Sequence, residues 1–165
     1  MAVTICRGVP ATTAGEPPAV GTILPPFTLT LPDLSELESH AYAGRNLILN
    51  VFPSVDTRVC ALSVRRFNEL AAGLPDTTVL CISHDLPFAL GRFCGAEGIE
   101  NVVAASAFRS SFGADFGLTL LDGIMRGLLA RTVIVAGADG IVRHVELTET
   151  TSQEPDYDAA LAALG

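Results

Sequence analysis

Asn46-Leu-Ile-Leu-Asn-Val-Phe-Pro-Ser-Val-Asp-Thr-Arg-Val-Cys60 is the stretch of sequence that decides the fold. Residues 47–52 are a nearly unbroken apolar run of strand length, which is typical of a strand buried on both faces of a sheet. Pro53 ends this strand because it lacks the N–H that a β-ladder needs. Over residues 60–70 the apolar residues recur at helical spacing, so the stretch predicts a central strand that runs directly into a helix.

Cys60 is expected in or next to the first turn of that helix. A helix N-terminus presents unpaired N–H groups and partial positive charge, and both favour a thiolate over a thiol. Arg58 would act in the same direction if its side chain points toward the sulfur. The alternative is that Cys60 is a structural cysteine on the apolar face of the helix.

Two further residues belong to the same stretch in a Pro-x-x-x-Thr-x-x-Cys pattern. Thr57 and Cys60 are three positions apart, so on a helical turn their side chains share a face. A hydroxyl there can accept and donate hydrogen bonds, which suits a substrate with an O–O–H group. Pro53 would shield the sulfur from water. Thr57 could equally be a plain helix cap.

Arg131 interrupts a run, residues 128–136, that otherwise reads as a buried strand. A guanidinium inside an apolar strand needs a partner, and a thiolate at the end of the neighbouring strand is a candidate. The alternative is an arginine that faces solvent from an edge strand.

Cys94 lies near the end of the helix predicted over residues 87–94. The pattern leaves open whether it pairs with Cys60 or is a packed helical cysteine.

Composition excludes several classes of protein. The chain has 165 residues, half of them apolar, which suits a single domain over residues 1–165. The formal net charge is −8 with no basic run, so we expect no nucleic-acid partner. No stretch is long and apolar enough to cross a bilayer, and no signal peptide is visible, so we expect a cytoplasmic protein.

The cysteines contain no Cys-x-x-Cys pair, so a zinc knuckle or a thioredoxin-type dithiol is not expected. Cys81 and His84 are the nearest thing to a metal pair, but two ligands are too few for a zinc site. We therefore expect no metal or organic cofactor. Separate thiols in a reducing compartment indicate catalysis or redox sensing.

The order of predicted elements indicates an α/β protein with a thioredoxin-like fold, in which helices flank a central mixed sheet behind an N-terminal β-hairpin. Asp85 is expected to cap the second helix, and Gly95 to end it. The predicted strands cover residues 3–7, 11–13, 27–31, 37–40, 47–52, 77–83, 102–104, 128–136 and 141–147, and the predicted helices cover residues 60–70, 87–94, 108–116 and 156–164.

The motif Phe52-Pro-Ser-Val-Asp-Thr-Arg-Val-Cys60 resembles the active-site signature of the bacterial thiol peroxidase branch of the peroxiredoxin superfamily (the atypical two-cysteine type). The stretch from Cys81 to Gly98 is similar to the second signature of that branch, and the tail that begins at Glu154 resembles it too. The likeness therefore covers nearly the whole chain.

The resemblance implies a role for each candidate residue. Cys60 would be the peroxidatic cysteine in a pocket completed by Thr57, Pro53 and Arg131, and Cys94 would be the resolving cysteine that forms an intramolecular disulfide with it. Cys81 would be a buried, non-catalytic thiol. The resemblance also implies a hydroperoxide substrate, reduction by thioredoxin, and a homodimer.

One position departs from the pattern of this branch. Position 58, commonly Pro or Gly in the branch, is arginine here. Phe88, Leu90 and Phe93 would either suit alkyl hydroperoxides or belong to the core. A disulfide needs Cα atoms within about 7 Å, so we expect the reduced protein to hold Cys60 and Cys94 farther apart. Part of one or both of their helices should then unwind on oxidation.

The alternative function is a peroxide sensor that reacts once and passes its disulfide to a partner protein.

Overall fold

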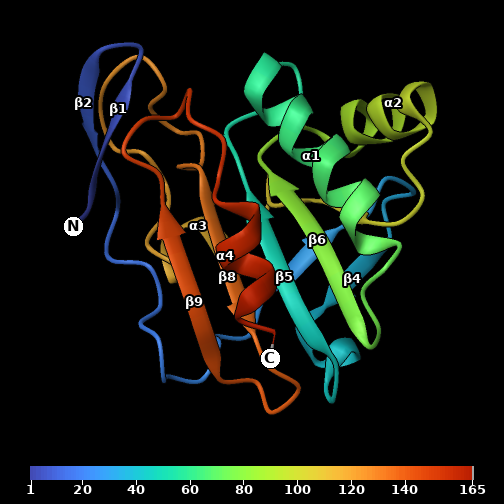
Figure 1. Ribbon diagram of the computed structural model, residues 1–165. Coiled ribbons are helices and arrows are strands. Elements are labelled where there is room, and N and C mark those ends of the chain that lie inside the picture. The colour runs from blue at the N-terminus through green and yellow to red at the C-terminus, as the bar shows by residue number, and fades with distance from the viewer. Residues whose placement is uncertain (165) are drawn as a thin grey trace.

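The computed structural model describes residues 1–164, and its strands form a seven-stranded mixed sheet and a separate two-stranded hairpin (Figure 1). The large sheet has the order β4-β3-β7-β6-β5-β8-β9. Its strands are β3 (Thr28–Thr30), β4 (Glu36–Glu38), β5 (Asn46–Val51), β6 (Thr77–Ser83), β7 (Val103–Ser106), β8 (Thr132–Ala136) and β9 (Val142–Leu147), and the hairpin consists of β1 (Val3–Cys6) and β2 (Val9–Thr12). The expected mixed sheet and N-terminal hairpin are confirmed.

The predicted central strand, β5, lies inside the sheet between two other strands. It pairs in parallel with β6 and antiparallel with β8, and every residue from Leu47 to Phe52 is buried. The apolar run follows from this position, because a strand that is covered on both faces has no solvent side on which to place polar residues.

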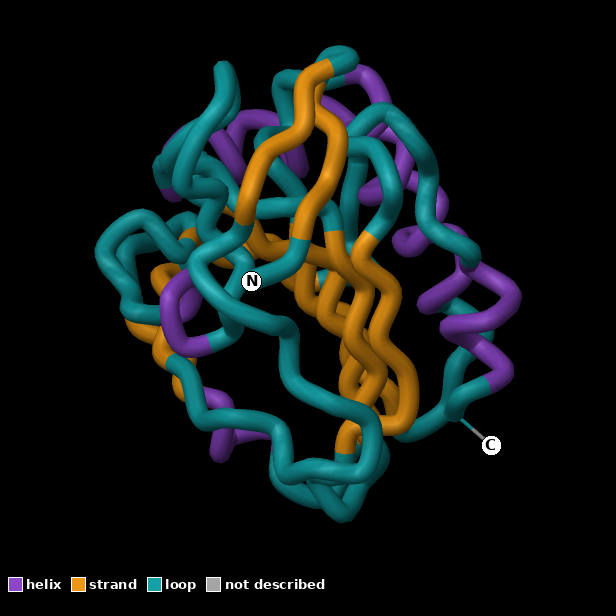
Figure 2. The backbone as a smooth tube through the Cα atoms, turned by 90° about the vertical axis from the view of Figure 1, so that its left-hand side faces the viewer, coloured by secondary structure: helices purple, strands orange, loops and turns teal. Residues whose placement is uncertain are grey.

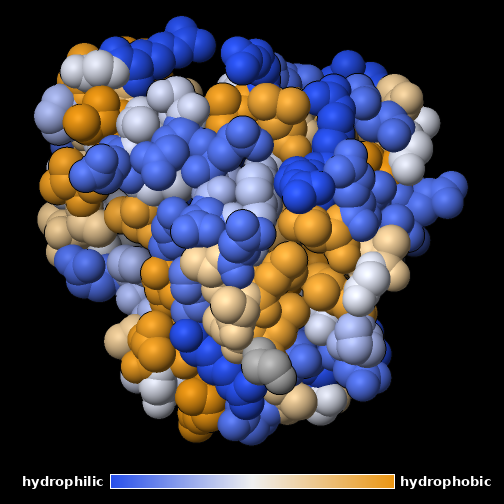
Figure 3. All heavy atoms as spheres, viewed as in Figure 1, coloured by the Kyte–Doolittle hydropathy of each residue, from blue (hydrophilic) through white to orange (hydrophobic). Residues whose placement is uncertain are grey.

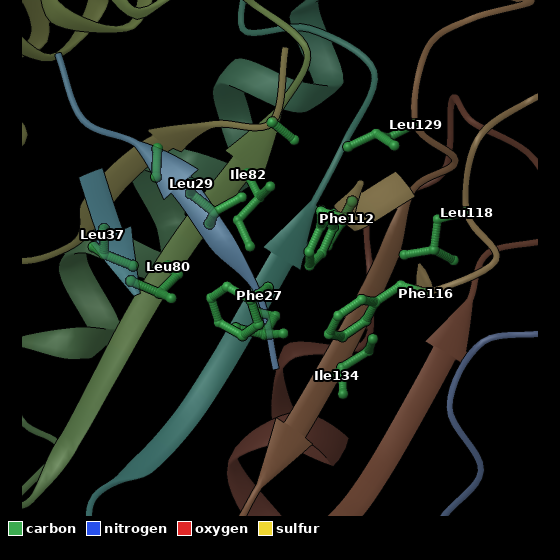
Figure 4. Packing of buried hydrophobic residues seen from close by; sticks show 14 of the residues in the cluster. Phe27, Leu29, Leu37, Leu80, Ile82, Phe112, Phe116, Leu118, Leu129 and Ile134 are labelled. Carbon is green, nitrogen blue, oxygen red and sulfur yellow. The ribbon is translucent and has the colours of Figure 1, made fainter. Parts of the chain in front are cut away.

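Alternate residues of the central strands point to opposite faces of the sheet and enter two separate cores. Ile48 and Phe52 belong to the core beneath α1 (Arg58–Ala71), α2 (Pro87–Glu97) and α4 (Tyr157–Ala162). Leu49 and Val51 belong to the core on the other face, where Phe27, Phe112 and Phe116 pack against one another (Figure 4).

The helices lie on both sides of the twisted sheet (Figure 2). The short helices α3 (Phe112–Asp115) and η1 (Ser39–Tyr42) lie apart from the layer that α1, α2 and α4 form. None of the helices in residues 1–164 combines the length and the apolar character that crossing a bilayer requires. The carboxyl end of β5, the start of α1 and the β1–β2 hairpin lie at the same edge of the sheet, the upper edge in Figure 1.

Two glycines account for differences between the predicted and observed boundaries. The hairpin turn is Arg7-Gly8, both with positive φ, so the turn residues predicted after them are already in β2. Helix α2 continues past Gly95 to Gly98, whose left-handed conformation (φ 64°, ψ 37°) caps it. The prediction that Gly95 ends the helix was wrong, and Cys94 therefore lies inside the helix.

Other predicted elements are shorter in the structure. The helix over residues 108–116 is reduced to α3, and Phe108 is 41% exposed whereas Phe112 and Phe116 are fully buried. The strand over residues 128–136 begins only at Thr132, because Leu128 and Ala130 form hydrogen bonds with Leu120 and Leu118 instead. The strand over 37–40 becomes β4 followed by η1, and the terminal helix is confined to α4.

Phe112→Ala should lower the free energy of unfolding by about 3–5 kcal/mol, because it removes a fully buried ring from the core in Figure 4. Phe108→Ala is the matched control and should cost about 0.5 kcal/mol or less. Urea denaturation followed by circular dichroism measures both. Equal losses for the two variants would contradict this account of the core.

Candidate active site

Cys60 lies in the first turn of α1 and is 1% exposed. The helix begins two residues earlier than predicted, with Thr57 at the N-cap position, so the Cys60 N–H is among those that lack an intrahelical partner. Thr57 makes no side-chain cap. Its hydroxyl donates instead to the Ser54 carbonyl oxygen at 2.9 Å, which leaves the hydroxyl oxygen free to accept a hydrogen bond.

Arg131 precedes β8, and its guanidinium contacts the sulfur of Cys60. Arg131 Nη2 donates to Cys60 Sγ at 3.0 Å, and both Nη2 and Nε donate to the Thr151 carbonyl oxygen, at 2.9 and 3.0 Å. The side chain is 1% exposed, so the solvent-facing alternative for this arginine was wrong. Cys60 and Arg131 are 71 positions apart in the sequence. They meet because α1 follows β5 and Arg131 directly precedes β8, which pairs with β5.

In the part of the chain that the structure describes, the charge of Arg131 has no carboxylate partner. No Asp or Glu in residues 1–164 lies within ion-pair distance of it, and its Nη1 is buried without a hydrogen-bond partner. An isolated buried cation is strongly disfavoured. Within residues 1–164 the hydrogen bonds of the guanidinium go to the Cys60 sulfur and the Thr151 carbonyl oxygen, and Nη1 remains as a donor for a further ligand.

The N-terminal hairpin supports the carbonyl that holds Arg131. Ile5 N donates to the Glu149 carbonyl at 2.8 Å, and Thr151 N donates to the Ile5 carbonyl at 3.0 Å. The Thr4 hydroxyl donates to the Thr148 carbonyl at 2.9 Å. These bonds fix the segment that carries Thr151, so the hairpin positions the guanidinium without touching the sulfur.

Cys60 opens onto a cavity of about 150 Å³. The structure places Pro53, Thr57 and Arg131 around the same cavity, as predicted, and its lining consists of Arg7, Pro53, Thr57, Arg58, Val59, Cys60, Met125, Arg131, Thr151 and Ser152. A larger hollow of about 540 Å³ lies beside β3 and β4, but no cysteine lines it among the described residues. Of these two cavities, the one at Cys60 is therefore the candidate active site.

The apolar residues expected near the site do not line this cavity. Leu90 is fully buried in the core beneath α2, Phe88 is 66% exposed, and Phe93 packs against the guanidinium of Arg65. Phe93 instead lines a neighbouring hollow of about 530 Å³ together with Thr57 and Arg58. The alkyl-binding interpretation of the three residues stays a prediction.

The other cysteines differ from Cys60 in their surroundings. Cys94 lies in α2, is half-buried and forms no disulfide, and burial raises the pKa of its thiol. Burial raises the pKa of Cys81 to about 12 and also raises the pKa of Cys6. None of the three has a guanidinium beside it as Cys60 does. Residues 1–164 hold no cluster of three or more possible metal ligands.

Asp85 has a structural role that the sequence did not reveal. Leu86, not Asp85, occupies the N-cap position of α2. The Asp85 carboxylate instead accepts hydrogen bonds from the Ser54 hydroxyl (2.6 Å), the Val55 N–H (2.9 Å) and the Ser83 hydroxyl (2.6 Å). It thereby holds the loop between β5 and α1 to the end of β6, and no local pattern indicates a partner 30 residues away.

Two ion pairs connect the helices that carry Cys60 and Cys94. Arg65 on α1 forms a bidentate pair with Glu97 on α2, with both N···O distances 2.9 Å. Arg92 on α2 reaches Asp56, just before α1, at 3.4 Å. These contacts hold the two helices in the arrangement in which both thiols are free.

Comparison with known proteins gives a consistent result. The family model named Redoxin matches residues 19–161. The chain is 58% identical over 165 residues to a protein named thiol peroxidase from Mycobacterium tuberculosis (strain H37Rv), covering 100% of this chain and 99% of that protein. It is also 58% identical over 164 residues to the thiol peroxidase of Corynebacterium glutamicum, covering 99% of each.

Solved structures agree with the architecture. A peroxiredoxin-like protein from Aquifex aeolicus superposes with a TM-score of 0.92 at 33% identity, covering 97% of this chain and 94% of that one. Thiol peroxidase from Chromobacterium violaceum superposes with a TM-score of 0.90 at 21% identity, covering 97% and 93%, and at that identity the likeness concerns the fold alone.

Arg131→Gln should slow the oxidation of Cys60 by hydrogen peroxide about 100-fold or more, because it removes the charged donors beside the sulfur. Arg131→Lys should not restore the rate, since an ammonium cannot reproduce the fork that contacts Sγ and the Thr151 carbonyl together. Stopped-flow measurement of the second-order rate constant tests both, after circular dichroism has verified folding. A folded Arg131→Gln variant with the wild-type rate would contradict this role.

Proposed function

The chain belongs to the Redoxin family, in the thiol peroxidase branch of the peroxiredoxins, and from this premise we propose that Cys60 is the peroxidatic cysteine of its hydroperoxide-reducing reaction. The observation that carries the assignment is the 3.0 Å contact between Arg131 Nη2 and Cys60 Sγ inside the cavity. It distinguishes Cys60 from the three other cysteines.

In the first step the Cys60 thiolate attacks the distal oxygen of the hydroperoxide. An S–O bond forms and the O–O bond breaks, so the sulfur becomes a sulfenic acid and the other oxygen leaves as an alkoxide or hydroxide that takes up a proton. The products are the sulfenic acid and an alcohol or water.

Arg131 and Thr57 are suited to different parts of this reaction. The unpartnered Nη1 of Arg131 can donate to the peroxide and stabilise the negative charge that moves onto the leaving oxygen. The Thr57 hydroxyl already donates to Ser54, so it offers an acceptor for the O–H of the substrate. Pro53 is buried and contributes no N–H that would compete for the peroxide.

Cys94 is the proposed resolving cysteine. Its thiolate attacks the Cys60 sulfenic sulfur, an S–S bond forms, and the hydroxyl leaves as water after protonation. Both cysteines lie within helices and are free in this structure. We therefore propose that α1, α2 or both unwind locally in this step. Burial raises the pKa of the Cys94 thiol, so unwinding also exposes it and favours its ionisation.

A dithiol protein reductant completes the cycle by thiol–disulfide exchange, and we propose that this reductant is thioredoxin. Two electrons from the reductant return both cysteines to thiols. Sulfur carries all of the redox chemistry in this scheme, without a metal or organic cofactor. We also propose that the enzyme acts in the cytoplasm as a homodimer built from this single domain, as the family resemblance implies.

A sensor that passes its disulfide to a partner protein would use the same cysteines, but it would consume one peroxide per molecule. Turnover distinguishes the two functions. The likeness to proteins named thiol peroxidase, at 58% identity over the full chain, favours the enzyme.

Cys60→Ser should abolish NADPH consumption in an assay that couples the protein to thioredoxin and thioredoxin reductase. Cys94→Ser should be oxidised once and then stop, leaving a Cys60 sulfenic acid that dimedone traps and mass spectrometry detects. Cys81→Ser is the matched control and should turn over, since Cys81 is fully buried with a pKa raised to about 12.

Continued turnover by Cys60→Ser would eliminate the proposed assignment. Continued turnover by Cys94→Ser would show that another thiol resolves the sulfenic acid. A wild-type protein that consumes a single equivalent of peroxide would instead favour the sensor.

Glu97→Gln should speed disulfide formation after sulfenylation, because it removes the ion pair to Arg65 that must break when the helices separate. An exposed pair of this kind contributes about 0.2–1 kcal/mol, which corresponds to an acceleration of up to about fivefold. Glu69→Gln is the matched control, because it breaks an ion pair within α1 and should have no effect. Quenched-flow mass spectrometry measures the rate, and equal rates for both variants would contradict the prediction.

A further inference from the structure

The cavity at Cys60 is far more basic than the rest of the chain. The protein has ten basic and eighteen acidic side chains, with a formal net charge of −8. Three of the ten basic residues, Arg7, Arg58 and Arg131, nevertheless line this one cavity, and its described lining includes no Asp or Glu. An anion therefore meets a local positive field that the overall charge does not suggest.

Arg131 and the two outer arginines are available for different tasks. Arg131 is buried and committed to Cys60 and Thr151. Arg7 and Arg58 are exposed, and neither forms an ion pair within residues 1–164. Arg65, Arg66, Arg92 and Arg143, by contrast, all pair with carboxylates. Arg131 thus contacts Cys60, whereas Arg7 and Arg58 stay without an ion-pair partner at the rim of the cavity.

The two rim arginines are brought together from separate elements. Arg7 occupies the left-handed first position of the hairpin turn (φ 49°), and Arg58 is the first residue of α1. In Figure 3, strongly hydrophilic side chains line the upper edge of the molecule, where the hairpin and the start of α1 lie in Figure 1. The unpaired N–H groups at the start of α1 add to the positive potential of Arg58.

We propose that Arg7 and Arg58 bind a carboxylate carried by the substrate, so that the enzyme prefers organic hydroperoxides with an anionic group. The proposal rests on the proposed function, since it assigns a substrate class to the Cys60 cavity. The hydroperoxide lies against Cys60 and Arg131. The carbon skeleton contacts the apolar lining of Pro53, Val59 and Met125, and the carboxylate reaches the rim guanidinium groups.

The size of the cavity fits a substrate larger than hydrogen peroxide. Its volume is about 150 Å³, whereas a cavity measured in this way needs only about 10–15 Å³ to hold one water molecule. A small aryl or alkyl hydroperoxide has a carbon skeleton that can carry a carboxylate from the sulfur toward Arg7 and Arg58. Hydrogen peroxide has no such skeleton, so it gains nothing from these two arginines.

The test compares two substrates that differ only in charge, cumene hydroperoxide and its para-carboxylate derivative. For the wild-type protein at low salt, kcat/KM should be about fivefold higher for the carboxylate, as expected for rim charges. The ratio should fall toward one as added salt shortens the Debye length. A change in the reactivity of Cys60 itself alters kcat/KM for both substrates by the same factor, so it cancels in the ratio.

Variants assign the preference to the two arginines. The double variant Arg7→Gln/Arg58→Gln should bring the ratio to about one, and Arg7→Lys/Arg58→Lys should retain most of the preference because the charges remain. Arg45→Gln/Arg143→Gln is the matched control. It removes the same charge near the opposite ends of β5 and β8, where Leu47 pairs with Ala136, and should keep the wild-type ratio.

A wild-type ratio of one or less would overturn the proposal, and so would a glutamine double variant that keeps the wild-type ratio. In either case turnover of cumene hydroperoxide would leave the peroxidase function standing. Failure of the wild-type protein to reduce both substrates would overturn the function and the specificity together.

Discussion

The structure depends on a buried guanidinium that no carboxylate within residues 1–164 neutralises. Arg131 is surrounded by protein, receives support from one carbonyl oxygen and donates to one sulfur. In most proteins a buried arginine is paired with Asp or Glu. Here the partner of the cation is a cysteine sulfur, so in the proposed reaction the contact that satisfies the guanidinium also prepares the nucleophile.

In the proposed reaction cycle the compact reduced protein opens partly at each turnover. Asp85 holds the loop before α1, and the pairs Arg65–Glu97 and Arg92–Asp56 connect α1 with α2. All three contacts are polar and at least partly exposed, and such contacts are individually weak. The apolar core beneath the helices is extensive. Local opening near the thiols is thus compatible with a stable sheet.

Periodicity predicted the central strand, the helix that follows it and the mixed sheet, because a strand buried on both faces leaves a continuous apolar run. It also predicted that Arg131 has a buried partner, because a charge inside an apolar run requires one. The role of Asp85 could not be predicted, because its partners come from another loop and tertiary contacts decided the cap of α2. Phe108 was misplaced for a similar reason: spacing does not reveal where a short helix begins.

The position of Thr151 in the sequence has a consequence for biosynthesis. The carbonyl that holds Arg131 lies 20 residues after that arginine, and it is itself fixed by the first strand, β1. The guanidinium can therefore settle beside Cys60 only after residue 151 has left the ribosome. Until then the Cys60 sulfur lacks the donor that Arg131 provides in the folded protein.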